Sequence, residues 1–417
     1  MKIGINTEIA FTYLVSRRKQ TIVAALGVTF GIGMFIFMNS LITGTNNWSE
    51  KVMLSSMPHI RLYNDNKISG HEMLDRYMGT NTINLISNPQ LVSQDNRITN
   101  PDELVRLLHE RKDITSLSKQ VTTNVIYNNG NVQENGKVLG VNILEQDKMF
   151  DITSTMVAGS VKAMSGNPNA ILIGVGLAEK LNLKKGDYVT VTTATTTGPV
   201  TKTLEVVGIF QTTIKAIDNT QSYANIPVVQ QLLHKDRSYI TDIYINIKDH
   251  IKAPETAELL QQQTGYTTEA WQTSNAQSLA GKKIRDIIAN SIVITILIVA
   301  GFGIYNILNM VIYEKIKEIA ILKATGFQGI HVIGIFIRQA LLIGLIGVIA
   351  GLIFGWLLSV AVSHIYIGVG TVEYLPIEFL LKHYVQGAVF GLATAFFAGY
   401  IPAVRASKVD PVQIIRG

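Results

Sequence analysis

The sequence predicts an α-helical membrane protein with four transmembrane helices and a large mixed α/β domain inserted between the first two helices. Three observations predict this class. Four long apolar stretches lack charged residues, positive charges gather beside them, and only 16% of all residues are charged. Soluble domains average roughly 25%. The domain between the first two helices occupies residues 44–283.

Each apolar stretch is long enough to cross a bilayer, because about 20 helical residues match a hydrocarbon core about 30 Å thick. The predicted spans are residues 22–43, 284–313, 339–363 and 384–404. A buried core helix is the alternative for any single span. The first could also be a signal peptide, but its apolar run is long and no A-x-A cleavage pattern follows it.

The positive charges orient these spans, because Lys and Arg concentrate in cytoplasmic loops. They occur in an interfacial N-terminal segment (1–21), a loop (314–338) and a tail (405–417), which are predicted to be cytoplasmic. The segments 44–283 and 364–383 are then periplasmic. The net charge of +6 therefore reflects topology and predicts no nucleic-acid partner.

The uncharged cores of the spans carry glycines at helical spacing. Ionisable residues usually mark ion or proton pathways in membranes, so their absence argues against an ion-coupled carrier. Small residues four apart let helix backbones approach closely. Two interpretations stay open for the third span, packing within one bundle or a dimer seam. The glycines predicted to pack helices are Gly27, Gly31, Gly347, Gly351, Gly355, Gly387 and Gly391.

The external domain reads as mixed α/β, with strands at 170–174, 188–193, 204–210 and 242–247. Helices are predicted at 175–181, 101–110 and 254–263, and a loop at Gly198-Pro199. No catalytic motif is complete. The stretch His71–Asp75 lacks the second histidine of a zinc-protease helix, and Gly130–Lys137 fails the P-loop spacing and reads as a polar hairpin. The chain has no cysteine and is predicted to bind no metal or cofactor.

The most informative segment is Tyr313–Gln328, Y-E-K-I-K-E-I-A-I-L-K-A-T-G-F-Q. Ile316, Ile319, Ala320 and Lys323 share one helical face, and a glycine follows where a helix would stop. A short amphipathic helix between two spans is predicted. By pattern alone, a plain interfacial helix is the alternative. The segment Asn6–Arg18 reads either as a second interfacial helix or as a polar leader.

The segment E-K-I-K-E-I-A-I-L-K-A-T-G-F resembles the signature after the second span of the FtsX-like ABC permease superfamily. The ending I-P-A-V-R-A-S-K-V-D-P-V-Q-I-I-R is similar to the usual family ending. The stretches G-V-T-F-G-I-G-M-F-I-F-M-N-S-L, M-P-H-I, E-V-V-G-I-F and W-Q-T-S-N-A look like the lipoprotein-releasing branch (LolC/LolE type), and N-A-I-L-I-G-V-G-L-A-E-K-L-N-L-K-K-G-D-Y-V resembles a common family element. The resemblance covers most of the chain.

This resemblance implies a permease that works by mechanotransmission with a separate ATPase dimer, which binds the ATP, and a second permease chain. It implies a location in the bacterial inner membrane and lipoprotein release to a periplasmic carrier. Two alternatives stay open, a macrolide-exporter (MacB) type of efflux permease with a periplasmic adaptor, and a non-transporting regulator of cell-wall hydrolases. Under all of them this chain is expected not to be an enzyme.

The resemblance also assigns residues to the contact with the ATPase. Gly326 would turn the chain back toward the third span, and a side chain there costs about 1 kcal/mol or more if φ is positive. We expect Gly326→Val or Glu318→Arg to uncouple ATP hydrolysis from work. The predicted coupling residues are Glu314, Lys315, Lys317, Glu318, Ile319, Ala320, Leu322, Lys323 and Gly326.

Overall fold

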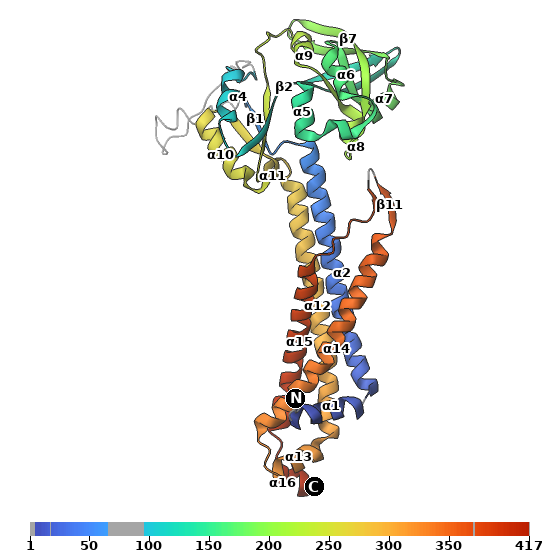
Figure 1. The fold of residues 1–417 in the computed structure, drawn as a ribbon, viewed down its shortest axis with the longest axis vertical. Coiled ribbons are helices and arrows are strands. Elements are labelled where there is room, and N and C mark those ends of the chain that lie inside the picture. The colour runs from blue at the N-terminus through green and yellow to red at the C-terminus, as the bar shows by residue number, and fades with distance from the viewer. Residues whose placement is uncertain (1–4, 17, 66–95, 370–371, 417) are drawn as a thin grey trace, which may run out of the picture. The chain divides into compact units, whose positions relative to one another are not determined.

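The computed structural model describes residues 5–16, 18–65, 96–369 and 372–416 (Figure 1). The motif at His71–Asp75 lies outside these residues. Two compact units divide the chain. The helical unit combines Met1–Ser49 with Ala280–Gly417, and the α/β unit is Glu50–Leu279. In the sequence, the α/β unit therefore lies between the two parts of the helical unit.

Four helices of the described chain are long and apolar enough to cross a membrane. They are α2 (Arg18–Ser56), α12 (Ala276–Glu314), α14 (Gly329–Ser363) and α15 (Leu381–Ser407). Each contains one predicted span and continues beyond it. Helix α14 begins ten residues before the predicted third span at 339, so much of the predicted loop 314–338 is helical. Shorter helices are α1 (Ile5–Ser16), α13 (Ile316–Ala324) and α16 (Pro411–Arg416).

The glycine stripe of α14 lies against α2. A Cβ added at Gly347 would come 2.6 Å from Val28 Cβ, and one at Gly351 2.8 Å from Ile32 Cβ. Real Cβ atoms do not approach so closely, so these positions need glycine for the two helices to touch. Gly355 and Gly391 are similarly tight, at 3.0 Å from Gly33 O and 2.3 Å from Ile32 Cδ1.

The other predicted packing glycines make looser contacts. An added Cβ at Gly27 would meet Ala300 Cα at 3.9 Å, and at Gly31 its nearest neighbour would be 3.6 Å away, both ordinary van der Waals distances. Gly387 is intermediate, at 3.3 Å from Phe35. The tight stripe is therefore used within this chain, in the helical unit, which is the first of the two interpretations for the third span.

The α/β unit is built on a ten-stranded sheet, counted over the described residues. Its order is β10-β1-β9-β2-β3-β8-β5-β7-β4, and β6 pairs with β2 and β7. The strands are β1 (Ile60–Tyr63), β2 (Ile114–Asn129), β3 (Val132–Val141), β4 (Met156–Gly159), β5 (Ala170–Gly174), β6 (Tyr188–Thr195), β7 (Gly198–Phe210), β8 (Gln221–Asn225), β9 (Asp242–Ile247) and β10 (Thr267–Ala270).

Short helices cover this sheet, and the helices that the sequence predicts are among them. The helices are α4 (Pro101–His109), α5 (Ile143–Phe150), η1 (Ile152–Thr155), α6 (Val161–Gly166), α7 (Val175–Lys180), α8 (Lys215–Thr220), α9 (Ile226–Leu232), η2 (His250–Lys252), α10 (Ala253–Thr264) and α11 (Trp271–Ser274). The predicted hairpin is confirmed, because β2 and β3 pair across a turn with Gly130 at φ 59°. The predicted loop at Gly198-Pro199 is wrong, because both residues belong to β7 and pair with residues of β6. The segment 364–383, which is predicted to be periplasmic, contains two paired strands, β11 (Tyr366–Val369) and β12 (Val372–Tyr374).

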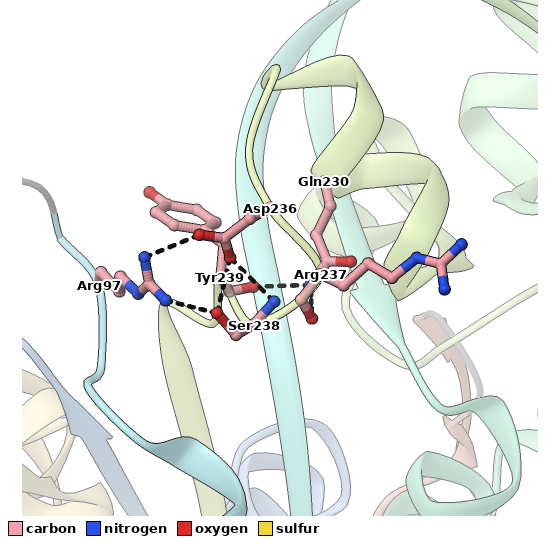
Figure 2. A network of polar contacts seen from close by, with 6 residues as sticks. All are labelled: Arg97, Gln230, Asp236, Arg237, Ser238 and Tyr239. Atoms are coloured by element: carbon pink, nitrogen blue, oxygen red, sulfur yellow. Dashed lines mark hydrogen bonds and ion pairs between the residues drawn. The ribbon is translucent and has the colours of Figure 1, made fainter.

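A polar network fixes the loop that leads into β9 (Figure 2). The Gln230 side chain, 2% exposed, donates to the carbonyl oxygens of Arg237 and Tyr239, both at 2.9 Å. Arg97 pairs with Asp236 at 2.9 Å and also donates to Ser238. Because buried Gln230 and half-buried Arg97 hold the loop from opposite sides, the start of β9 has a defined position in the sheet.

Candidate functional site

The predicted coupling segment forms a separate short helix. Helix α12 ends at Glu314, Lys315 leaves the helical backbone, and α13 begins at Ile316. The helix ends where the Phe327 amide donates to Leu322 O at 3.0 Å and Gly326 adopts φ 104°. No atom lies within 4 Å of an added Cβ at Gly326, so its constraint is the left-handed backbone alone. The prediction that α13 stops at Gly326 is therefore confirmed.

The nine predicted coupling residues divide between two faces. Ile319 and Ala320, 2% and 0% exposed, pack into the helical unit's own core, and Leu322 and Lys323 are half-buried. Glu314, Lys317, Glu318 and Gly326 are exposed, and Lys315 is half-buried. Only the exposed residues of α13 are available to a partner without rearrangement. The exposed face also includes Ile321, 56% exposed, which sequence reasoning did not select.

Helix α1 lies against α13 through an aromatic contact. The Tyr13 hydroxyl donates to Glu318 at 3.2 Å, and Lys315 bridges both residues, 2.5 Å from Glu318 and 5.3 Å from the Tyr13 ring. Burial, reinforced by the Glu318 carboxylate, raises the pKa of Tyr13 to about 12, so the hydroxyl keeps its proton and remains a donor at neutral pH. The contact holds the start of α13 against α1.

A groove of about 400 Å³ lies between these helices. It is lined by Glu8, Ile9, Thr12, Tyr13, Glu318, Ile321 and Leu322. Of the two interpretations of the N-terminal segment, the helix is correct. The signal in the sequence was the apolar set Ala10, Tyr13 and Leu14, which is buried here. Pattern alone could not show that its partner is α13.

The far end of α13 is tied to the C-terminal segment. Lys323 Nζ donates to Ser407 O at 2.9 Å and to Val409 O at 2.6 Å. Both acceptors are carbonyls at or just beyond the end of α15, where a helix leaves its last carbonyl groups without partners. The lysine therefore joins α13 to the end of α15. Lys323 is more than 80 residues away from both acceptors in the sequence, so pattern analysis could not reveal this contact.

The described residues offer no alternative chemistry at this site. No group of three or more His, Asp or Glu side chains among them could hold a metal ion. The P-loop-like stretch Gly130–Lys137 is the turn and first part of β3, in the α/β unit. The site is a surface of one short helix whose two ends are held by Tyr13 and by the contacts of Lys323.

Comparison with known proteins extends along the whole chain. The lipoprotein-releasing system transmembrane protein LolC of Neisseria meningitidis serogroup B is 27% identical over 99% of both chains. LolC of Haemophilus influenzae is 23% identical over 96% of this chain and 94% of its own. LolE of H. influenzae is 23% identical over 98% of each.

Family models match both parts of the chain. The model of the MacB-like periplasmic core domain matches residues 21–263, and that of the FtsX-like permease C-terminal matches residues 290–411. The first match covers more than half of the sequence and contains nearly all of the α/β unit. The second contains α13, α14 and α15. The chain belongs to the family of FtsX-like ABC transporter permeases with a MacB-like periplasmic core domain.

Proposed function

We propose that this permease releases lipoproteins from the bacterial inner membrane. The observation that carries the proposal is the end-to-end similarity to LolC, a transmembrane protein of the lipoprotein-releasing system, over 99% of both chains. The spans agree with this use, because their cores contain no ionisable residue that could serve an ion or proton path. Work is then done by movement of the α/β unit outside the membrane.

The energy for that movement comes from a separate ATPase dimer, and a second permease chain completes the membrane part. This chain holds the permease fold and no complete nucleotide-binding motif in its sequence. We assign α13 as the helix that the ATPase contacts. Exposed Lys317, Glu318 and Ile321 form the contact surface, while buried Ile319 and Ala320 pass the displacement to the bundle.

The coupling assignment is tested with Glu318→Arg in proteoliposomes that contain the permease pair and its ATPase. We expect the variant to fold and insert but to lose ATP-driven lipoprotein release, because a charge reversal on the contact surface repels the groups that received Glu318. Gly326→Val should act similarly by straining the end of α13. Release and ATPase activity are measured together, since uncoupling separates them.

Tyr13→Phe is the matched control. It removes only the hydrogen bond from Tyr13 to Glu318 and keeps the ring under Lys315. If Tyr13→Phe were as defective as Glu318→Arg, the defect would come from the contact within the chain and the ATPase-contact assignment would fail. Normal release by both Glu318→Arg and Gly326→Val would also contradict it.

The substrate class is tested by depletion in the native host. Lipoproteins should accumulate in the inner membrane within a few generations, which fractionation and immunoblotting detect. Unchanged lipoprotein sorting together with increased sensitivity to macrolides would instead favour the efflux alternative. Unchanged sorting with a cell-separation defect would favour the regulator of hydrolases.

A further inference from the structure

The α/β unit contains a cavity of about 400 Å³ on one face of its sheet. This volume is within the range of small-ligand sites in proteins, about 300–1,000 Å³. Phe150 of α5 and Trp271 of α11 add aromatic walls, and the last residues of α2 contribute to the rim. The strands β10, β1, β9, β3, β8 and β7 supply Glu269, Arg61, Tyr244, Lys137, Tyr223 and Phe210.

The strand register separates this cavity from the apolar core. Residues paired across neighbouring strands share a face, and successive residues alternate between faces. Ile60 pairs with Ile245, and both are completely buried in the apolar core. The next pair, Arg61 with Tyr244, lies on the opposite face and lines the cavity. The covered second face therefore combines polar side chains with a smaller apolar cluster that includes Leu139, Phe210 and Tyr223.

Strand β2 lies between β9 and β3 in the sheet and carries buried oxygens without partners on the same face, although its residues are not part of the cavity lining. Ser118 pairs with Tyr244 and Thr122 with Leu139, so both share the cavity face, as does Gln120 between them. Over the described residues, Ser118 Oγ, Gln120 Oε1 and Thr122 Oγ1 are buried and make no hydrogen bond. Ser118 and Gln120 are 1% and 0% exposed. Such atoms cost free energy unless a polar group is supplied.

Of the two cationic side chains of the cavity, Arg61 has a carboxylate partner and Lys137 forms no hydrogen bond or ion pair within the described residues. Arg61 binds Asp242 at 2.5 Å, and that carboxylate is 2% exposed. Within the described chain, neither the Lys137 ammonium nor the Tyr244 hydroxyl has a hydrogen-bond or ion-pair partner. Burial lowers the pKa of Lys137, the charge of Arg61 acts in the same direction, and the nearby Asp242 carboxylate opposes both. Glu269 of β10 pairs in register with Arg61 of β1 and adds one acceptor to the lining.

We propose that this cavity binds a short peptide segment with an acidic side chain. The carboxylate would pair with Lys137, and aromatic or aliphatic side chains would pack on Phe150, Tyr223 and Trp271. The peptide backbone offers donors and acceptors together, which suit the Tyr244 hydroxyl and the polar side chains of Gln146 and Gln221 in the lining. An acyl chain would leave those groups unpaired. This proposal does not depend on the lipoprotein-release function.

The test begins with a library of random heptapeptides displayed on phage. The full chain in nanodiscs of zwitterionic lipid is the target, and Lys137→Met in identical nanodiscs removes peptides that bind elsewhere. We expect the surviving peptides to be enriched in Asp or Glu next to aromatic residues. Failure to enrich any peptide that distinguishes the two targets would overturn the proposal.

Affinities of an enriched peptide, labelled with fluorescein, are then measured by fluorescence anisotropy. Loss of a charged hydrogen-bond partner should weaken binding by about tenfold or more in Lys137→Met, whereas Lys137→Arg should retain most of it. Lys162→Met makes the same charge change at an exposed position of α6 and should bind like the wild type. Equal affinity in Lys137→Met and wild type, with equal thermal stability, would overturn the assignment.

Discussion

Close contact between backbones makes single glycines decisive in the helical unit. Gly351 lies where the backbone of α14 touches α2, with Ile32 Cβ 2.8 Å and Thr29 O 3.0 Å from the position of an added Cβ. At Gly303 of α12, no atom of the described residues outside the neighbouring backbone of its own helix lies within 4 Å of the same position. The two residues look alike in the sequence, as glycines within apolar helices, and differ only in what faces them.

We expect Gly351→Ala to destabilise the permease and Gly303→Ala to leave it unchanged or slightly more stable. Overpacking of a tight contact costs about 1–3 kcal/mol. Replacing an unhindered helical glycine by alanine instead gains up to about 1 kcal/mol. The apparent unfolding temperature of each variant in nanodiscs is the measurement. Equal temperatures for both variants would contradict the close contact between α2 and α14.

Short elements acquire their role from neighbours that are distant in the sequence. Helix α13 has nine residues and would be marginal in isolation. It is held at one end by Tyr13 of α1 and at the other by Lys323, which binds carbonyls at the end of α15. Its Ile319 packs in the core shared with α14. These contacts let a force on α13 reach three other helices.

We expect Lys323→Met to release the C-terminal segment from α13 without unfolding the bundle. Amide hydrogen exchange of residues 408–416 should increase, because two hydrogen bonds that fix this segment are lost. Exchange in α2 and α14 should stay unchanged. Lys317→Met is the control, since Lys317 is exposed on the same helix. An increase of the same size in the control would show that Lys323 is no tether.

At the scale of the whole molecule, the absence of cysteine makes the predicted topology directly testable. Thr196 lies in the turn between β6 and β7 of the α/β unit, and Lys317 lies on α13. Both are exposed. The charge bias predicts that these positions lie on opposite sides of the inner membrane.

We expect Thr196→Cys to react in intact cells with a maleimide that cannot cross the inner membrane. Lys317→Cys should react only after that membrane is opened. The cysteine-free parent chain gives the background. Labelling of Lys317→Cys in intact cells, with Thr196→Cys protected, would reverse the predicted orientation and remove α13 from reach of a cytoplasmic ATPase.

The sequence by itself determined the four apolar helices, the inserted domain and the short helix ended by Gly326. Each depends on local properties, namely the length of an apolar run, the alternation of side chains, and the left-handed backbone that glycine accepts. The hairpin at Gly130 was likewise local, whereas the predicted loop at Gly198 is the start of β7 and much of the predicted loop 314–338 is helical.

The tertiary structure alone decided which side of α13 is free, which glycines touch α2, and where the cavity lies. Ile319 and Ile321 are both isoleucines of one helix, yet one is 2% and the other 56% exposed. Likewise, Lys137 and Tyr244 are separated by more than 100 residues and line one cavity. Such pairings depend on strand register and helix packing, which bring together residues that no local pattern connects.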